Sequence, residues 1–246
     1  MVLVPFPKSK ADEYKAKIEL AQSYEELMKI IADIEYDIQK IQNAEEKIHL
    51  MLVLAEGYLF AGYPDKTLDL INSIRRWIKS SKELEEILVN FEATAFNAKR
   101  KPDKALEIIK EYESKYGELP DTLKIRKMIA YINLGDFEKA LQIYNQFGEN
   151  TLAQKEPFFF PVLKERFEAY KKARELLSKD KDFRRAFEIL KNKGFKVAPM
   201  FDDELQEGMF YMYIQSDNPD EIVKKEDEAF SLILEQVGKP YTVMSI

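Results

Sequence analysis

Apolar residues recur along most of this chain at intervals of three and four, the spacing that places them on one face of a helix. The pattern is clearest around Gly135. The apolar residues before it that share one face are Ile125, Met128, Ile129 and Ile132, and those after it are Phe137, Ala140, Leu141 and Tyr144. A glycine ends a helix by turning left-handed at little cost, and Asp136 can cap the next helix. The sequence therefore predicts two antiparallel helices joined by a tight turn.

The same order of helix, break and helix recurs at 13–31, 54–74, 91–112 and 171–190. Ser23 and Glu26 have the spacing of a capping box, and Pro102 suits a first helical turn. Equivalent positions in the second helices are Leu27, Thr67, Ala105, Ala140 and Ala186, separated by 40, 38, 35 and 46 residues. A repeated two-helix unit of this length predicts a helical solenoid, in which each hairpin buries its apolar face against the next.

These units resemble the tetratricopeptide repeat (TPR) family. The best match is 128–147, through Tyr131, Gly135, Phe137, Ala140 and Tyr144. The units at 55–74 and 93–112 match through Ala55, Tyr58 and Gly62 and through Ala93, Phe96 and Ala105, with Thr67 where the family usually has alanine. The resemblance covers residues 9–195 and implies an all-α fold, a right-handed α–α superhelix of about five hairpins. A plain helical bundle with accidental periodicity is the alternative.

The remaining residues do not follow the repeat. Pro199 breaks the pattern, 202–215 has the composition of a helix with an acidic first turn, and 221–238 predicts a final helix ended by Gly238. We expect an N-terminal arm at 1–8, a repeat array at 9–195, and a C-terminal helical cap and tail at 196–246.

The resemblance also implies a concave groove lined by the first helix of each hairpin. The residues expected to face it are His49, Leu52, Glu56, Leu59, Asn90, Thr94, Asn97, Ile125, Arg126, Ile129 and Asn133. Family members that clamp a peptide carboxylate use a set of Lys, Asn and Arg, and this chain has Leu52 and Glu56 at two of the corresponding positions. We therefore expect an extended peptide or a partner helix in the groove, with asparagines bonding its backbone.

Two stretches are dense in aromatic and methionine side chains, which suit adaptable binding surfaces. Their residues are Phe158, Phe159, Phe160, Met209, Phe210, Met212 and Tyr213. The alternative is that they form ordinary core between the last repeat and its cap.

Charge is distributed unevenly along the chain, whose net charge is -6. Residues 164–196 hold 12 Lys/Arg against 6 Asp/Glu, and residues 202–246 hold 3 Lys against 11 Asp/Glu. The basic segment either pairs with the acidic one inside the chain or binds an acidic partner. The overall negative charge argues against general nucleic-acid binding.

The composition is that of a folded protein, with 46% hydrophobic and 33% charged residues. Cysteine is absent, which excludes disulfides, thiolate metal sites and a cysteine nucleophile. Abundant Lys and Glu without Cys fit the cytosol of a thermophile. The start of the chain lacks the features of a signal peptide and no apolar run reaches the roughly 18 residues of a membrane span, so we expect a cytoplasmic protein.

Candidate chemistry is sparse. Glu46 and His49 have the Glu-x-x-His spacing of di-metal carboxylate helices, but those sites need the motif twice and the chain has one histidine. Carboxylate pairs such as Asp202 with Asp203 could do acid–base work, and the alternative function is a hydrolase or metal-dependent enzyme on a helical scaffold that uses acidic clusters near His49. We expect instead a non-catalytic scaffold without a cofactor that holds a protein or peptide, or assembles with itself through its apolar termini. A regulator that senses a small ligand or a peptide is a further alternative.

Overall fold

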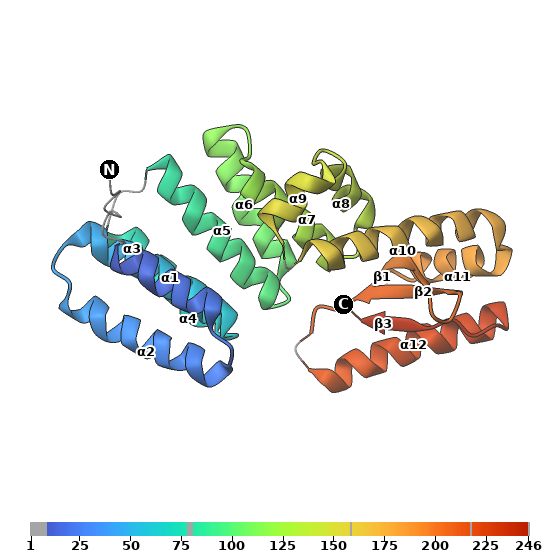
Figure 1. Ribbon diagram of the computed structural model, residues 1–246. Coiled ribbons are helices and arrows are strands. Elements are labelled where there is room, and N and C mark those ends of the chain that lie inside the picture. The colour runs from blue at the N-terminus through green and yellow to red at the C-terminus, as the bar shows by residue number, and fades with distance from the viewer. Residues whose placement is uncertain (1–8, 78–80, 158, 217, 246) are drawn as a thin grey trace. The chain divides into compact units, whose positions relative to one another are not determined.

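The computed structural model describes residues 9–77, 81–157, 159–216 and 218–245, which form twelve helices and three strands. The arm expected at 1–8 lies outside these residues. The chain divides into two compact units, one of Met1–Lys99 with Glu107–Leu123 and one of Arg100–Leu106 with Lys124–Ile246. The division passes through two of the helices. Figure 1 labels the helices and strands along the chain.

The first unit is entirely helical in its described part. Its helices are α1 (Lys10–Leu20), α2 (Tyr24–Lys40), α3 (Ala44–Phe60), α4 (Pro64–Trp77), α5 (Lys82–Ala98) and most of α6 (Pro102–Tyr116). Helices α1 to α3 share one apolar core, and α3 to α5 share a second, so that α3 contributes to both. Packing of each helix on its neighbours in sequence is compatible with a helical repeat.

Two local predictions can be compared with this unit. Ser23 caps α2 by accepting the N–H of Glu26, while the Glu26 carboxylate accepts the N–H of Gln22, one residue before the position that a capping box requires. Thr67 is fully buried and donates its hydroxyl to the carbonyl of Ala55 at 3.1 Å. That bond satisfies the buried hydroxyl and joins α3 to α4.

The second unit combines helices with a small sheet. Its elements are most of α7 (Asp121–Asn133), α8 (Phe137–Tyr144), α9 (Glu149–Lys155), α10 (Phe160–Lys179), α11 (Lys181–Asn192), β1 (Lys196–Asp202), β2 (Glu207–Tyr213), α12 (Pro219–Val237) and β3 (Val243–Ser245). The predicted break is confirmed: Gly135 has φ +74° and Asp136 accepts the N–H of Lys139 at the start of α8. The final helix is confirmed as α12, ended by left-handed Gly238.

The prediction of a purely helical cap is wrong. The strands pair in the order β1-β2-β3, with β1 antiparallel and β3 parallel to β2. The stretch expected as one helix, 202–215, forms a turn and β2. Six apolar and aromatic residues follow Gly208 without helical spacing, and such a short run favours a buried strand. The fold is therefore mostly helical with a small three-stranded sheet.

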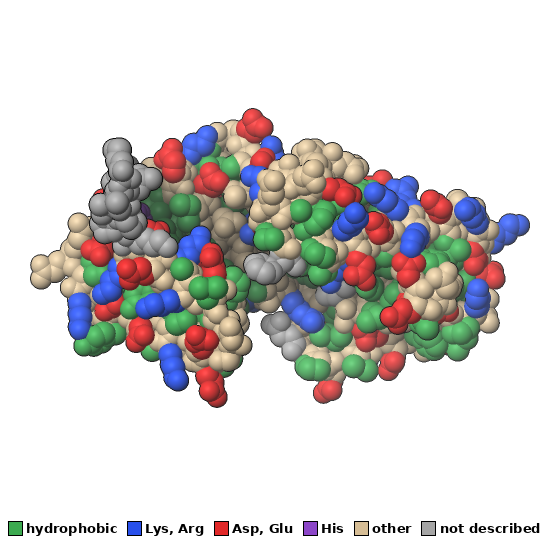
Figure 2. Space-filling model, viewed as in Figure 1, with side chains coloured by type: hydrophobic (Ala, Val, Ile, Leu, Met, Phe, Trp, Pro, Cys, Tyr) green, Lys and Arg blue, Asp and Glu red, His purple; other side chains and the backbone are tan. Residues whose placement is uncertain are grey.

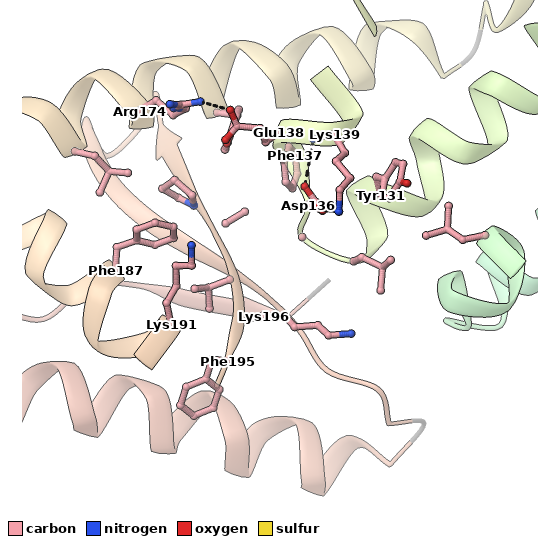
Figure 3. A pocket seen from close by; sticks show the side chains of 18 residues that line it. Tyr131, Asp136, Phe137, Glu138, Lys139, Arg174, Phe187, Lys191, Phe195 and Lys196 are labelled. Atoms are coloured by element: carbon pink, nitrogen blue, oxygen red, sulfur yellow. Dashed lines mark hydrogen bonds and ion pairs between the residues drawn. The ribbon is translucent and has the colours of Figure 1, made fainter. Parts of the chain in front are cut away.

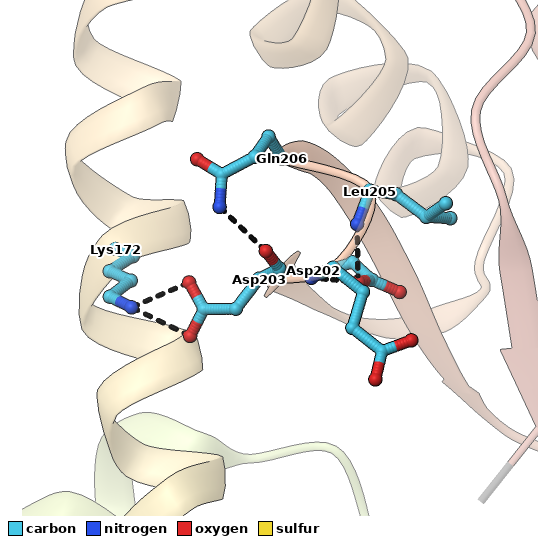
Figure 4. Close-up of polar contacts among 6 residues, drawn as sticks. Lys172, Asp202, Asp203, Leu205 and Gln206 are labelled. Carbon is cyan, nitrogen blue, oxygen red and sulfur yellow. Dashed lines mark hydrogen bonds and ion pairs between the residues drawn. The ribbon is translucent and has the colours of Figure 1, made fainter.

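The loop between β1 and β2 is anchored at several points (Figure 4). Asp202 accepts the N–H groups of Glu204 and Leu205, and the Gln206 amide donates to the carbonyl of Asp203. Lys172 of α10 binds both carboxylate oxygens of Asp203 at 2.6 Å. The basic and acidic segments thus pair at this point, although both side chains are about half exposed and the pair adds little stability.

Helices cover both faces of the sheet. Ala198 and Met200 of β1 join the core of α7, α8, α9 and α10. Val197 of β1 and Phe210 of β2 join the core of α11 and α12. Alternate residues of one strand point to opposite faces, so this arrangement explains why β1 carries a continuous apolar run instead of an alternating one.

Candidate functional site

One cavity lies in the second unit, beside β1, and has a volume of about 800 Å³. That is within the range of small-ligand and peptide pockets. The α7–α8 turn, the start of α8, α10, α11 and the first half of β1 line it (Figure 3). Figure 3 shows Tyr131, Asp136 and Lys139 on one side of β1 and Phe187 and Lys191 on the other.

The turn between α7 and α8 reaches the cavity because of Gly135. A side-chain carbon at this position would lie 3.7 Å from the carbonyl oxygen of Lys196, which is ordinary contact, but the left-handed backbone is costly for any residue with a side chain. The turn therefore brings the backbone of the repeat against the first residues of β1. The motif that most resembles the TPR family thus supplies one wall of the cavity.

The cavity has an aromatic lining and a cationic rim. The aromatic residues are Tyr131, Phe137, Tyr170, Phe187 and Phe195, and the charged ones are Asp136, Glu138, Lys139, Arg174, Lys191 and Lys196. Four cationic side chains thus stand against two acidic ones. An anionic group entering the cavity would meet a net positive charge close to apolar surface.

Two of the four cations are already paired. Lys139 binds Asp136 at 2.6 Å, and Arg174 binds Glu138 at 3.0 Å. Across the described ranges of the chain, Lys191 and Lys196 have no ion pair and contact only aromatic rings, Phe187 at 5.3 Å and Tyr213 at 5.1 Å. These two lysines are therefore the cations with free capacity for a ligand.

Burial and charge fix the protonation of the other polar groups. Burial raises the pKa of Tyr170, which stays a neutral phenol. The hydrogen bond from Lys139 to Asp136 raises the pKa of Lys139, and the negative charge of Glu138 raises the pKa of Arg174. Both shifts favour the charged forms of Lys139 and Arg174.

A smaller cavity, of about 210 Å³, lies in the first unit between α4, α5 and α6. Arg75 occupies its wall between the carboxylates of Glu85 and Glu92, at 3.0 and 2.8 Å. The buried hydroxyl of Tyr112 also lines it and has no hydrogen-bond partner among the described residues. Its polar groups are mostly paired with one another, and a water molecule would satisfy the tyrosine.

None of the eleven groove residues expected from the sequence lines either cavity. In the first unit, His49, Leu52, Glu56 and Leu59 lie on α3 and Asn90, Thr94 and Asn97 on α5, and these two helices pack together. His49 is exposed, the other six are half-buried, and the Thr94 hydroxyl donates to the Asn90 carbonyl of its own helix. Burial raises the pKa of Glu56.

The groove residues expected in the second unit all lie on α7. Ile125 is fully buried in the core, and Ile129 packs against it while half-buried. Arg126 pairs with Glu156 at 2.8 Å, and Asn133 is half-buried. Ile125 is therefore a packing residue, not a residue that faces a ligand.

The residues expected to form a partner surface are mostly inside the protein. Met209, Phe210, Met212 and Tyr213 are buried on β2, and a surface role for them is corrected to core. Phe159 and Phe160 are half-buried and pack against the core around α10, and Phe158 lies outside the described residues. The predicted helix at 202–215 did not imply that both faces of this stretch are covered.

No group of three or more His, Asp and Glu side chains suited to a metal ion occurs in the described ranges. No helix within those ranges has both the length and the apolarity needed to cross a bilayer.

Several residues of the larger cavity were not identified from the sequence. The sequence places Lys191, Phe195 and Lys196 within a basic segment, and Pro199 predicts a break in the helical pattern. The available signal was Pro199 itself, since proline within an apolar run is tolerated in an edge strand. Interpreted in that way, "KVAPMF" predicts a strand with one open edge, and the neighbouring lysines would have been candidate ligands.

Comparison of this chain with protein-family models, curated proteins and solved structures finds no match in any of the three.

Proposed function

We propose that this protein is a binding module and that the cavity beside β1 holds an acidic peptide segment of a partner protein. The observation that carries the proposal is that Lys191 and Lys196, at the rim of an aromatic cavity, have no ion pair among the residues that the structure describes. Aromatic surface beside cationic groups suits a segment that alternates apolar and acidic side chains.

In this proposal, the α7–α8 hairpin supplies part of the binding site. We regard the helical part as a TPR-like superhelix whose fourth hairpin has been joined to a sheet. Its Gly135 turn then presents Lys139 and Tyr131 to the ligand, in place of the concave face of the array. A scaffold role follows, because a peptide site on a rigid helical frame tethers one protein to another.

The test uses two blocked, fluorescent hexapeptides, one alternating valine with glutamate and one alternating valine with lysine. We expect the glutamate peptide to bind at least about tenfold more tightly in fluorescence anisotropy, which corresponds to about 1.4 kcal/mol. In the double variant Lys191→Glu and Lys196→Glu, the preference should reverse because the free cations have become anions.

A matched control carries the same change of charge at two other lysines, one at each end of α11. Lys181 and Lys193 are exposed and do not line the cavity, so Lys181→Glu with Lys193→Glu should bind as the parent protein does. An equal loss of affinity for the glutamate peptide in both double variants would show that the loss comes from the change in net charge. Absence of binding by either peptide up to about 1 mM, where a complex has about 4 kcal/mol of binding free energy, would overturn the proposed function.

A further inference from the structure

One side of the β1 backbone has no hydrogen-bond partner among the residues that the structure describes. Phe210 of β2 donates its N–H to the carbonyl of Thr242 at 2.9 Å, so the backbone groups of Phe210 point toward β3. Phe210 lies opposite Pro199 in the antiparallel ladder. Bonded and non-bonded pairs alternate in such a ladder, so Ala198 and Met200 bond to β2, while Val197 and Pro199 turn their backbone groups away from it.

These outward groups have no partner within the described ranges of the chain. The sheet places β1 at its edge, with β2 as its one neighbour there. No other backbone or side-chain group of those ranges bonds to the N–H of Val197 or to the carbonyls of Val197 and Pro199. An edge strand with open donors and acceptors is a template on which another extended chain can pair.

The open edge coincides with the cavity. Four consecutive residues, Lys196 to Pro199, line it although their side chains alternate between the two faces of the sheet. On one face Ala198 packs with Phe137 and Tyr170, and on the other Val197 packs with Phe187 and Leu190. The cavity is therefore lined by α8, α10, α11 and the first residues of β1, whose side chains Figure 3 shows.

We infer that the acidic segment binds as a fourth strand, paired with Val197 and Pro199 along the edge of β1. This inference rests on the proposed function and specifies the conformation of its ligand. Main-chain bonds to β1 supply affinity, and alternate side chains fall on the two walls. Those on the α11 side meet Lys191 and Phe187, and those on the α8 side meet Tyr131 and Lys139. An acidic side chain on the α11 side thus reaches a lysine without an ion pair.

The occupant follows from charge and backbone together. A helical partner would have no free N–H or carbonyl for Val197 and Pro199, because its own turns use them. An extended peptide has both, and acidic side chains complement Lys191 and Lys196. Pro199 offers an acceptor without a donor, so the peptide must give two N–H groups, to Val197 and Pro199, and one carbonyl, to Val197.

The first experiment places N-methyl groups on the valine–glutamate hexapeptide. One version carries them on every glutamate and the other on every valine, so the two have equal mass and charge. If the peptide pairs with β1, alternate amides point at the strand, and one version should lose at least about tenfold in affinity while the other stays within about threefold of the parent peptide. The version that loses affinity shows whether the peptide runs parallel or antiparallel to β1.

The second experiment changes the protein. Val197→Pro removes the outward N–H without touching a bond to β2, and proline is compatible with an edge strand. This substitution should weaken the binding of the unmethylated valine–glutamate peptide about tenfold. The control Val197→Ala shortens the same side chain and keeps the N–H, and should bind within about threefold of the parent. Circular dichroism of both variants checks the fold.

The outcomes separate the two levels of the proposal. Equal effects of the two methylation patterns, with the parent peptide bound, would overturn strand addition and leave the proposed function standing. Failure of the parent peptide to bind would overturn both. If Val197→Pro does not fold, the methylated peptides still decide the question, since they need only the unaltered protein.

Discussion

Gly208 shows how one residue fixes the sheet against the helices. A side-chain carbon at this position would lie 2.6 Å from Phe183 and 2.8 Å from Leu176. Phe183 cannot move aside, because it is fully buried and stacked on Phe210 at 4.8 Å. Glycine is therefore required here for space, with no need of a special backbone angle.

We expect Gly208→Ala to lower the free energy of unfolding by about 1–3 kcal/mol, the usual cost of an overpacked core. Urea denaturation followed by circular dichroism measures it. Gly148→Ala is the control, since an added carbon there meets nothing closer than 4.0 Å and the loss should be smaller. Equal losses in the two variants would show that the tight contact around Gly208 relaxes without cost.

Glu56 is a second residue whose surroundings have a measurable effect. Burial raises its pKa, an effect to which Glu19 adds and which Lys15 partly offsets. A carboxyl group with a raised pKa in the folded protein binds more protons there than in the unfolded chain. The contribution of Glu56 to the free energy of unfolding is therefore greatest below the ordinary pKa of glutamate. It is lost as the pH rises through the raised pKa of the folded protein.

Glu56→Gln should therefore raise the melting temperature at pH 7, by about 1–3 °C, and bring no gain near pH 4. Melting curves of both proteins across this pH range measure the difference. Glu107→Gln, exposed on α6, should show no such dependence. A gain of the same size at both pH values would mean that the effect of Glu56 does not come from its charge.

At the scale of elements, α4 and α5 are joined by a half-buried charge cluster. Arg75 of α4 donates to Glu85 and Glu92 of α5 at 3.0 and 2.8 Å, and all three side chains are less than one-third exposed. The surrounding carboxylates raise the pKa of Arg75 despite its burial. Removing the cation would leave two carboxylates facing each other in a poorly solvated place.

We expect Arg75→Gln to cost about 1–3 kcal/mol, in line with hydrogen bonds to charged groups. Its neighbour Arg76 is exposed and, among the residues that the structure describes, bonds to a backbone carbonyl of its own helix, so Arg76→Gln should change stability by less than about 0.5 kcal/mol. Chemical denaturation of the two variants provides the comparison. If Arg76→Gln proves as damaging as Arg75→Gln, the cluster does not stabilise the α4–α5 contact.

The sequence predicted the elements with strong helical spacing and missed those without it. Gly135 with Asp136, and Gly238, mark helix ends by local backbone geometry, which a short window of sequence contains. The strands at 196–202 and 207–213 depend on helices from distant parts of the chain that cover both faces. A run such as Met209 to Tyr213 is apolar throughout and has no period that distinguishes strand from helix.

The candidate site was difficult to predict for a similar reason. The expected groove came from the register of the first helices, but the cavity is built from a turn, the helices α8, α10 and α11, and one end of a strand. Lys191 and Lys196 are neighbours in sequence, yet their freedom from ion pairs depends on where Asp136 and Glu138 find other partners. Such pairing is a property of tertiary structure and is not encoded in any short segment.

At the scale of the whole molecule, charge of both signs is interspersed over the face shown in Figure 2, with hydrophobic side chains between. The net charge of -6 would repel an acidic ligand at long range. At physiological ionic strength that repulsion is screened beyond about 8 Å, so the local balance at the cavity decides binding. The protein can therefore be acidic overall and still hold an acidic segment.

Pro199 has one more consequence. Because its ring removes an amide from the outward side of β1, the next outward donor after Val197 is Phe201, about 13 Å farther along the strand. Another extended chain can therefore pair with β1 over a few residues, but it cannot form a continuous ladder of hydrogen bonds along the strand. The edge that binds a short peptide thus disfavours continuous strand pairing between copies of this protein, and with it the growth of fibrils.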